Sequence, residues 1–488
     1  MGKKELTALG VRDAVALLEK KDLSSVELTQ ACLERVEEVE PKINALVTIT
    51  NEQALAKAKQ IDERRAKGEK LGKLAGVPGI IKDCICTKDV LSTASSKMLH
   101  NYKPVYNATV IDKLEAEDFV MIAKANMDEF ALGSSTETSY FGKTKNPWDL
   151  ERVPGGSSGG SAASVAAGEA MFALGSDTGG SVRQPAAFCG VVGLKPTYGT
   201  VSRNGLMAFA SSLDQIGPVA KNVEDAAYLL DMIAGNDPQD STSAIMEYPR
   251  YGEGMKDDIK GMKVGVPKEY MEQELSDDMR AALKDSIEKL EEMGAVVEET
   301  SLPTFDYALS AYYVIAAAEV TSNLSRFDGI RYGYRTKQYD NLKEMYKNTR
   351  SEAFGDEAKR RIMLGNYVLS AGYYDAYYLK ALRVRTLIRQ DFDKLFGKYD
   401  VLLSPTTSDG AFKLGEKTRP IDMYVTDLFT VPVNIAGMTA ISIPAAMTKK
   451  TNMPLGVQVI AKAFDENTMF RAAYHLEQAL GFNGKPNL

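Results

Sequence analysis

Residues 153–161 read VPGGSSGGS, and a second glycine-rich run, GSDTGGS, follows at residues 175–181. Glycine and serine runs are often flexible linkers or turns. Here, however, the first run continues into AASVAAGEA, a small-residue stretch suited to a closely packed helix, and then into the apolar MFALGSD. Linkers are not normally embedded between segments of this kind. We therefore interpret both runs as parts of one folded site.

Backbone amides beside a helix N-terminus can bind a phosphate group, so a phosphate cradle is the second interpretation of these runs. A P-loop requires GxxxxGK[ST], and the GKT sequence at residues 142–144 has Glu137 where the first glycine should stand. No GxGxxG motif lies in a strand–turn–helix unit. The sequence therefore argues against nucleotide binding by this chain.

The overall composition narrows the function further. It is 44% hydrophobic and 26% charged, as in globular proteins, and the formal net charge of -7 provides no basic face for independent nucleic-acid binding. Gly, Pro or charged residues interrupt every apolar run before it reaches the length of a membrane span, and the N-terminus lacks the apolar core of a signal peptide. We expect a cytoplasmic protein that makes no membrane contact.

Cysteine and histidine counts limit the possible catalytic chemistry. The four cysteines form no paired CxxC sets, so neither a zinc site nor a disulfide framework is predicted, and we expect no metal. The only histidines are His100 and His475. A Ser-His-Asp hydrolase would need His100 as its base, but nothing around His100 resembles a nucleophile or an orienting carboxylate.

The first part of the chain, residues 1–65, is helical in pattern. Ser24 and Glu27 form a capping box ahead of the helical stretch VELTQACLERVEEVE. Pro41 follows that stretch, and we expect the helix to end before it. These N-terminal helices precede the part of the chain that carries the glycine-rich runs.

The whole chain, residues 1–488, is predicted to form one α/β domain. Short apolar runs separated by Gly and Pro alternate with helical patterns over residues 66–245, and strand patterns return over residues 398–488. Together these two parts form the predicted catalytic core. Residues 246–397 are interpreted as a mainly helical insertion into it, with a strand and turn at MKVGVPKEY, residues 262–270.

A third interpretation of the glycine-rich runs is an oxyanion hole built from the backbone. In DTGGS, residues 177–181, Gly179 and Gly180 lack the Cβ atoms that would block a close approach. The amides of Thr178, Gly179, Gly180 and Ser181 can then point at a developing oxyanion while the Ser181 hydroxyl attacks.

Such a serine nucleophile needs a base, and with histidine almost absent the available base is a lysine. Burial can lower the pKa of a lysine enough to populate its neutral amine. Lys82 lies in GVPGIIKDCIC, residues 76–86, which is an apolar, strand-like run. Considered alone, a lysine at a strand end would more simply reach solvent, so Lys82 becomes a candidate only together with the serines.

The ordered set of Lys82, GGSSGGS (155–161) and DTGGSVRQPA (177–186) resembles the amidase signature family, whose members use a Ser-Ser-Lys triad. The resemblance implies that Ser181 is the nucleophile, Ser157 the middle serine, preceded by a cis peptide bond, and Lys82 the base. It also implies the amidase signature fold, in which helices cover both faces of a large mixed central β-sheet.

Other stretches are similar to one branch of that family, the glutamine-hydrolysing A subunits of tRNA-dependent amidotransferases. They are MDEFALGSSTETSYFG (127–142), CGVVGLKPTYGTVSRNGLMAFASSLDQIGP (189–218), KRRIMLG (359–365), SAGYYDAYY (370–378) and MYVTDLFTVPVNIAGM (423–438). Glutamine carries an α-carboxylate and an α-ammonium, so a selective pocket should offer one cation and one anion. The resemblance assigns these roles to Arg361 and Asp427, with Arg360 and Asp422 close enough to remain alternatives.

The same resemblance implies a cytoplasmic heterotrimer. In it, this chain would need no cofactor and would supply ammonia to a B subunit, which uses ATP and Mg²⁺ to amidate misacylated Glu-tRNA(Gln) or Asp-tRNA(Asn), and a small C subunit would join the two. Two alternatives remain open. One is a stand-alone amidase of small amides, and the other is a non-catalytic scaffold, which would have no reason to retain Lys82, Ser157 and Ser181 together.

Overall fold

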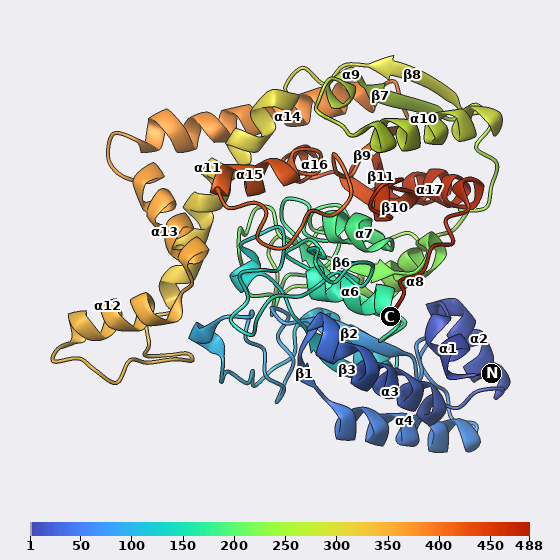
Figure 1. Ribbon diagram of the computed structural model, residues 1–488, viewed down its shortest axis with the longest axis horizontal. Helices are drawn as coiled ribbons and strands as arrows, with labels where there is room; N and C mark the ends of the chain where they lie inside the picture. Colours follow the sequence, from blue (N-terminus) through green and yellow to red (C-terminus); the bar gives the residue numbers. More distant parts are fainter. Residues whose placement is uncertain (1) are drawn as a thin grey trace.

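A mixed β-sheet of eleven strands runs through the computed structural model, which describes residues 2–488 (Figure 1). In chain order the strands are β1 Leu46–Ile49, β2 Pro78–Lys82, β3 Val120–Ala125, β4 Phe172–Asp177, β5 Val192–Lys195, β6 Gln215–Ala220, β7 Lys263–Pro267, β8 Val296–Thr300, β9 Val401–Pro405, β10 Thr439–Met447 and β11 Pro454–Ala461. Their order across the sheet is β1-β3-β2-β4-β6-β5-β10-β11-β9-β7-β8.

Parallel and antiparallel pairs both occur in this sheet. β2 lies between β3 and β4 and runs parallel to both, and β7 runs parallel to β8 and β9. Between these two parts, from β4 to β9, all pairs are antiparallel. β2, β4, β6 and β11 are buried along their whole length, which agrees with their largely apolar sequences. The predicted α/β class with a large mixed sheet is confirmed.

Helices cover the sheet from two sides. They are α1 Lys3–Ala8, α2 Val11–Lys20, α3 Ser25–Ile43, α4 Asn51–Ala66, α5 Thr109–Ala116, α6 Gly159–Ala167, α7 Arg183–Cys189, α8 Val223–Ile233, α9 Lys268–Met271, α10 Asp277–Glu292, α11 Phe305–Asn323, α12 Leu342–Ala353, α13 Asp356–Val368, α14 Lys380–Leu395, α15 Pro420–Tyr424, α16 Val431–Ala436 and α17 Glu466–Leu480. α6 packs beside α7, and α17 packs beside α8 and α10. α7 and α17 both contact β10 and β11, so these two helix groups enclose the same strands (Figure 1).

The N-terminal capping box forms as the sequence predicts, but the helix ends at a different residue from the one predicted. The Ser24 hydroxyl accepts a hydrogen bond from the Glu27 amide, and the Glu27 carboxylate accepts one from the Ser24 amide. α3 then continues past Pro41 to Ile43, and its C-cap residue, Asn44, has a left-handed backbone. Proline removes only one amide donor, so the last turn persists and the prediction that the helix ends before Pro41 is wrong.

The part of the chain over residues 246–397 contains α9 to α14, but it is more than a helical insertion. β7 and β8 also belong to it and form one end of the central sheet, where β7 pairs with β9. β1 likewise lies within the stretch of residues 1–65 that was expected to be helical. The sequence interpretation predicted β7 as a strand but missed two strands, β1 and β8.

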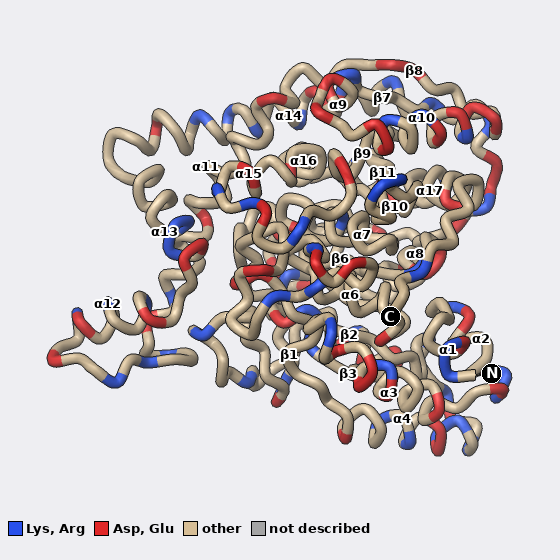
Figure 2. The backbone as a smooth tube through the Cα atoms, in the orientation of Figure 1, with Lys and Arg blue, Asp and Glu red and all other residues tan. Residues whose placement is uncertain are grey.

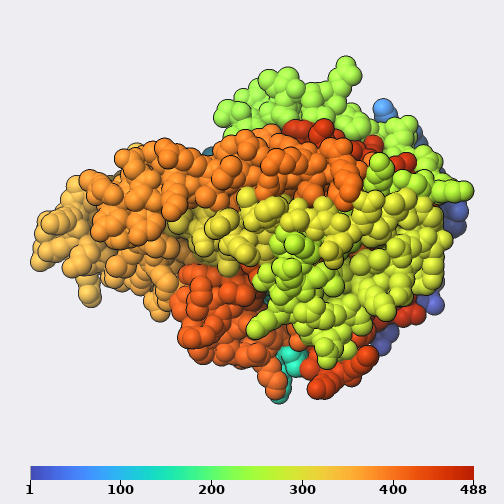
Figure 3. Space-filling model, turned by 90° about the horizontal axis from the view of Figure 1, so that it is seen from above, coloured from blue at the N-terminus to red at the C-terminus, as the bar shows by residue number. Residues whose placement is uncertain are grey.

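α12 and α13 form an arm at one side of the molecule (Figures 1 and 3). Along the outer helices, Lys and Arg are interleaved with Asp and Glu (Figure 2). In the described residues, no helix combines the length and the apolar character that a membrane crossing requires.

Candidate active site

Lys82 is the last residue of β2, and its amine is fully buried. Nζ lies 2.8 Å from Ser157 Oγ, 2.7 Å from Ser158 Oγ and 2.9 Å from Ser176 Oγ. Burial lowers the pKa of Lys82, because the charged ammonium loses its hydration. The lowered pKa favours the neutral amine of Lys82, which could accept a proton from the neighbouring Ser157 hydroxyl.

Ser157 lies just before α6, and the peptide bond between Gly156 and Ser157 is cis. Its carbonyl oxygen accepts a hydrogen bond of 3.3 Å from the Asp128 amide. The Asp128 carboxylate in turn accepts hydrogen bonds from the amides of Ser135 and Thr136. The middle serine is thus held from the segment that follows β3.

Ser181 lies beside this segment, at the end of the turn after β4. Its carbonyl oxygen accepts a hydrogen bond of 3.0 Å from the Ser158 amide, which joins the two glycine-rich runs. The residue is 8% exposed, and its hydroxyl makes no hydrogen bond to any residue within 2–488. The Lys82–Ser157 contact is therefore formed, while the Ser181 oxygen remains open to an incoming carbonyl group.

The turn that carries Ser181 offers fewer amides than the sequence predicts. The Gly180 amide donates to Asp177 Oδ1 at 2.8 Å, so it is not available to an oxyanion in this structure. The amides of Thr178, Gly179 and Ser181 donate to no acceptor among the described residues. Gly180 has φ +134°, and a Cβ there would lie 2.1 Å from Thr430 Oγ1, so glycine at this position shapes the turn.

A fully buried ion pair between Asp177 and Arg183 spans the turn, with the Arg183 Nε 3.1 Å from Asp177 Oδ2. Burial alone would raise the pKa of Asp177, but the charge and hydrogen bonds of Arg183 outweigh it and lower the pKa to about 2. Sequence reasoning missed this pair, although both residues lie in the quoted DTGGSVRQPA. The sequence signal that could have predicted the pair is an acidic residue and an arginine on either side of a glycine turn.

Arg361 projects from α13 and is buried. Its Nε donates to Glu357 Oε1 at 2.7 Å, and its guanidinium lies 4.5 Å from the ring centre of Tyr313 and 4.4 Å from that of Tyr424. Nη1 is buried with no partner among the described residues. A buried, incompletely paired guanidinium is suited to bind a carboxylate.

Asp427 lies next to the same tyrosine. Its Oδ2 accepts hydrogen bonds from Ser134 Oγ at 2.8 Å and from the Tyr313 hydroxyl at 3.2 Å. Burial raises the pKa of Asp427 to about 7. Because Tyr313 contacts both groups, Arg361 and Asp427 lie in one buried region.

Two further contacts join this region to the serines. Thr430 Oγ1 donates to the Gly179 carbonyl at 2.6 Å, and the Thr430 amide donates to the Asp427 carbonyl at 3.1 Å. Gln184 accepts from the Gly156 amide and donates to the Ser134 carbonyl, both at 2.9 Å. Sequence reasoning did not single out Gln184, although it too lies in DTGGSVRQPA.

The two alternatives left open by the sequence lie outside this region. Arg360 is 47% exposed at its side chain and pairs with Glu357 on the same helix. Asp422 pairs with Arg419 at 2.6 Å and is 33% exposed. Both make local surface ion pairs, whereas Arg361 and Asp427 are buried.

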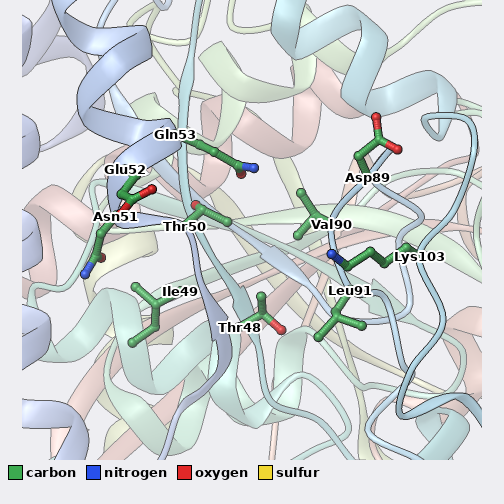
Figure 4. A pocket seen from close by; sticks show the side chains of 10 residues that line it. All are labelled: Thr48, Ile49, Thr50, Asn51, Glu52, Gln53, Asp89, Val90, Leu91 and Lys103. Atoms are coloured by element: carbon green, nitrogen blue, oxygen red, sulfur yellow. The ribbon is translucent and has the colours of Figure 1, made fainter.

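A separate surface cavity of about 330 Å³ lies beside β1 (Figure 4). Residues 48–53, residues 89–91 and Lys103 line it. None of the candidate catalytic or substrate-binding residues belongs to this lining. The chemistry of the serines and Lys82 is therefore not connected with this cavity.

Comparison with known proteins places this geometry in a family. The profile of the family described as Amidase matches residues 27–470. Proteins named as the A subunit of glutamyl-tRNA(Gln) amidotransferase are 58% identical in Desulforamulus reducens, over 95% of both chains, and 57% identical in Carboxydothermus hydrogenoformans, over 99% of this chain and 100% of that one. A crystal structure of a protein with the same name from Thermotoga maritima is 42% identical, with a TM-score of 0.81, and covers 97% of this chain and 95% of its own.

These similarities extend over nearly the whole chain and agree with the arrangement of Lys82, Ser157 and Ser181 described above. The profile match alone spans most of the sequence, from α3 to α17. The chain therefore belongs to the amidase family.

Proposed function

We propose that the chain is the glutamine-hydrolysing A subunit of a tRNA-dependent amidotransferase. The observation that carries this proposal is the buried contact of Lys82 with Ser157, placed beside a buried region that holds one guanidinium and one carboxyl group. The names of the relatives, whose sequences match this chain end to end, support the same function.

The reaction begins at Ser181. Its oxygen attacks the side-chain amide carbon of glutamine while its proton passes to Ser157 Oγ, and the Ser157 proton passes to the neutral amine of Lys82. The developing oxyanion lies against free amides of the turn, those of Thr178, Gly179 and Ser181. Gly180, one of the four amides first predicted, contributes by shaping the turn.

Collapse of this intermediate breaks the carbon–nitrogen bond. Lys82 returns its proton through Ser157 to the leaving nitrogen, so ammonia departs and a γ-glutamyl ester remains on Ser181. Water then attacks the ester, with the same relay accepting its proton, and releases glutamate. Each step uses groups of this chain only.

Selectivity for glutamine comes from Arg361 and Asp427. Arg361 binds the α-carboxylate of glutamine, and Asp427 binds its α-ammonium. These two contacts replace the hydration that each charged group loses when it is buried. The pKa of Asp427 is raised to about 7 by burial, and an ammonium ion beside the carboxylate favours its ionised form. A small amide without these two charges gains nothing from either residue.

The ammonia serves a partner. We assign the activation of Glu-tRNA(Gln), of Asp-tRNA(Asn) or of both to a B subunit that uses ATP and Mg²⁺, in a cytoplasmic heterotrimer joined by a small C subunit. The absence of a P-loop from the sequence and the net charge of -7 support this division of labour.

The decisive experiment traps the covalent intermediate. The protein is incubated with glutamine, quenched with acid and digested, and the glutamyl ester is sought on the peptide that contains Ser181 by mass spectrometry. Parallel rates with glutamine and with butyramide, which lacks both α-groups, test the selectivity. Equal rates on the two amides would instead indicate a stand-alone amidase, and full hydrolysis by Ser181→Ala would refute the nucleophile.

A further inference from the structure

The carboxyl group of Glu129 is buried outside the site described above, yet it connects two of its parts. Its Oε2 accepts a hydrogen bond of 2.8 Å from the Gly355 amide, and its Oε1 accepts one of 2.5 Å from Ser96 Oγ. Gly355 is the residue that precedes the first turn of α13. A carboxylate in this position satisfies a free amide of the helix and interacts favourably with the positive end of its dipole.

A second contact joins the same two segments. The ring of Phe130 lies 5.7 Å from that of Phe354 and 5.0 Å from that of Phe327. A Cβ at Gly355 would lie 2.6 Å from Glu129 Oε2, so a larger residue there would require the Glu129 side chain to shift. The start of α13 is therefore fitted closely onto residues 129–130.

The residue that precedes Glu129 in the sequence contacts Ser157, the middle serine of the proposed triad. The preceding residue, Asp128, donates its amide to the Ser157 carbonyl, and its carboxylate holds the amides of Ser135 and Thr136. The Glu129 amide donates to Thr138 Oγ1 at 3.0 Å. Two consecutive residues thus contact the middle serine at one side and the helix of the arm at the other.

The helix held in this way carries Arg361. Arg361 follows Gly355 by six positions, on the same helix and within about 9 Å along its axis. α13 belongs to the arm, and its N-terminus is the end that touches the core through residues 129–130 (Figure 1). A displacement of that first turn would move the guanidinium away from its place beside Tyr313.

We propose that Glu129 is a positioning residue for substrate binding: it ties the N-terminus of α13 to the segment that holds Ser157, and so keeps Arg361 at a fixed place relative to the triad. This role rests on the proposed glutaminase function. It requires no contact between Glu129 and the substrate, and it predicts that loss of the tie weakens binding of the α-carboxylate without impairing the serine chemistry.

The test compares steady-state rates of Glu129→Ala, Glu129→Gln and the unchanged protein on glutamine and on butyramide. For Glu129→Ala we expect the KM for glutamine to rise by about tenfold, the size of effect that loss of a helix-capping contact can produce, while kcat/KM for butyramide stays within twofold. The uncharged side chain of Glu129→Gln keeps one acceptor for the Gly355 amide. Its KM for glutamine should therefore lie between those of Glu129→Ala and the unchanged protein.

Asn341→Ala is the matched control, because Asn341 caps the neighbouring helix α12 by accepting from the Glu344 amide at 3.0 Å. It should leave the KM for glutamine unchanged. An equal loss on both substrates, an unchanged KM in Glu129→Ala, or the same rise in the control would overturn the positioning role. If the unchanged protein shows no preference for glutamine over butyramide, the proposed function fails instead, and butyramide turnover by each variant shows that it is folded.

Discussion

At the scale of single residues, the proposed mechanism depends on the protonation state of Lys82. Only the neutral amine can accept the Ser157 proton, and burial lowers the pKa of Lys82 from its ordinary value. A lowered pKa means that the neutral form is present above that pKa and is lost as the pH falls through it. The acid side of the pH–rate profile therefore reports this lysine.

We expect kcat/KM for butyramide to decrease as the pH falls, with a slope that corresponds to one proton. Butyramide is the better probe because glutamine binding also involves Asp427, whose pKa of about 7 would add a second ionisation. Stopped-flow or ammonia-release assays over a pH series measure the effect. A profile that stays flat until the protein unfolds would contradict the role of Lys82 as base.

The two serines of the triad should differ in what their removal abolishes. Ser181→Ala removes the atom that forms the ester, so no acyl-enzyme should be detected. Ser157→Ala retains the nucleophile and loses the proton relay, which typically contributes about 10²–10⁴-fold to the rate, so slow acylation should persist. Single-turnover mass spectrometry separates the two variants. Faster acylation in Ser157→Ala than in the unchanged protein would exclude the relay.

The candidate triad was assigned from short, local motifs, but the neighbours of its residues could not be predicted in this way. Ser158 and Ser176 both contact Lys82, and nothing in the glycine-rich runs distinguishes them from Ser157. The Gly180 amide was wrongly expected to be free, since the sequence does not show that the Asp177 carboxylate turns back to accept from it. Such contacts depend on the path of the backbone, which residue types alone do not specify.

At the scale of elements, the turn between β4 and α7 depends on the buried pair of Asp177 and Arg183. Asp177→Asn leaves the Arg183 guanidinium buried with only neutral partners, such as Gln458 and Asn434. Loss of one partner of a buried pair typically costs about 3–5 kcal/mol, and we expect a decrease of that order in the free energy of unfolding. Urea unfolding followed by circular dichroism measures it.

Asp422→Asn is the control for this variant, because it breaks the exposed ion pair with Arg419. Exposed pairs contribute little, so its urea midpoint should coincide with that of the unchanged protein. Equal midpoints for Asp177→Asn and the unchanged protein would show that the turn does not depend on the pair. Turnover measured well below the unfolding midpoint would then show whether the turn still presents Ser181.

Element boundaries were predictable where a local signal exists. The Ser24 and Glu27 capping box places the start of α3 correctly because its contacts span only three residues. β7 was predicted as a strand, but its pairing with β9 was not, because β9 lies far away in the sequence. β8, which pairs with β7 at the end of the sheet, was absorbed into the mainly helical insertion. The same distance in sequence hides the contact of Glu129 with Gly355.

At the scale of the whole molecule, the proposed selectivity for glutamine depends on the position of the arm relative to the core. The triad lies in the core, near β2, β4 and α6, whereas Arg361 lies on α13 and Asp427 just before α16. The sequence resemblance assigned roles to all of these residues. The fold brings Arg361 and Asp427 into contact with the same side chain, Tyr313 of α11.

The last prediction concerns what the whole chain can do without partners. Because it contains its own nucleophile, relay and candidate pocket, the purified chain should release ammonia from glutamine. Because it has no P-loop and carries a net charge of -7, it should not amidate Glu-tRNA(Gln) when ATP and Mg²⁺ are added. Ammonia release and acid-gel analysis of the aminoacyl-tRNA measure the two activities on the same sample. Amidated tRNA should form only after the partner subunits are added, and its formation by the isolated chain would contradict the proposed division of labour.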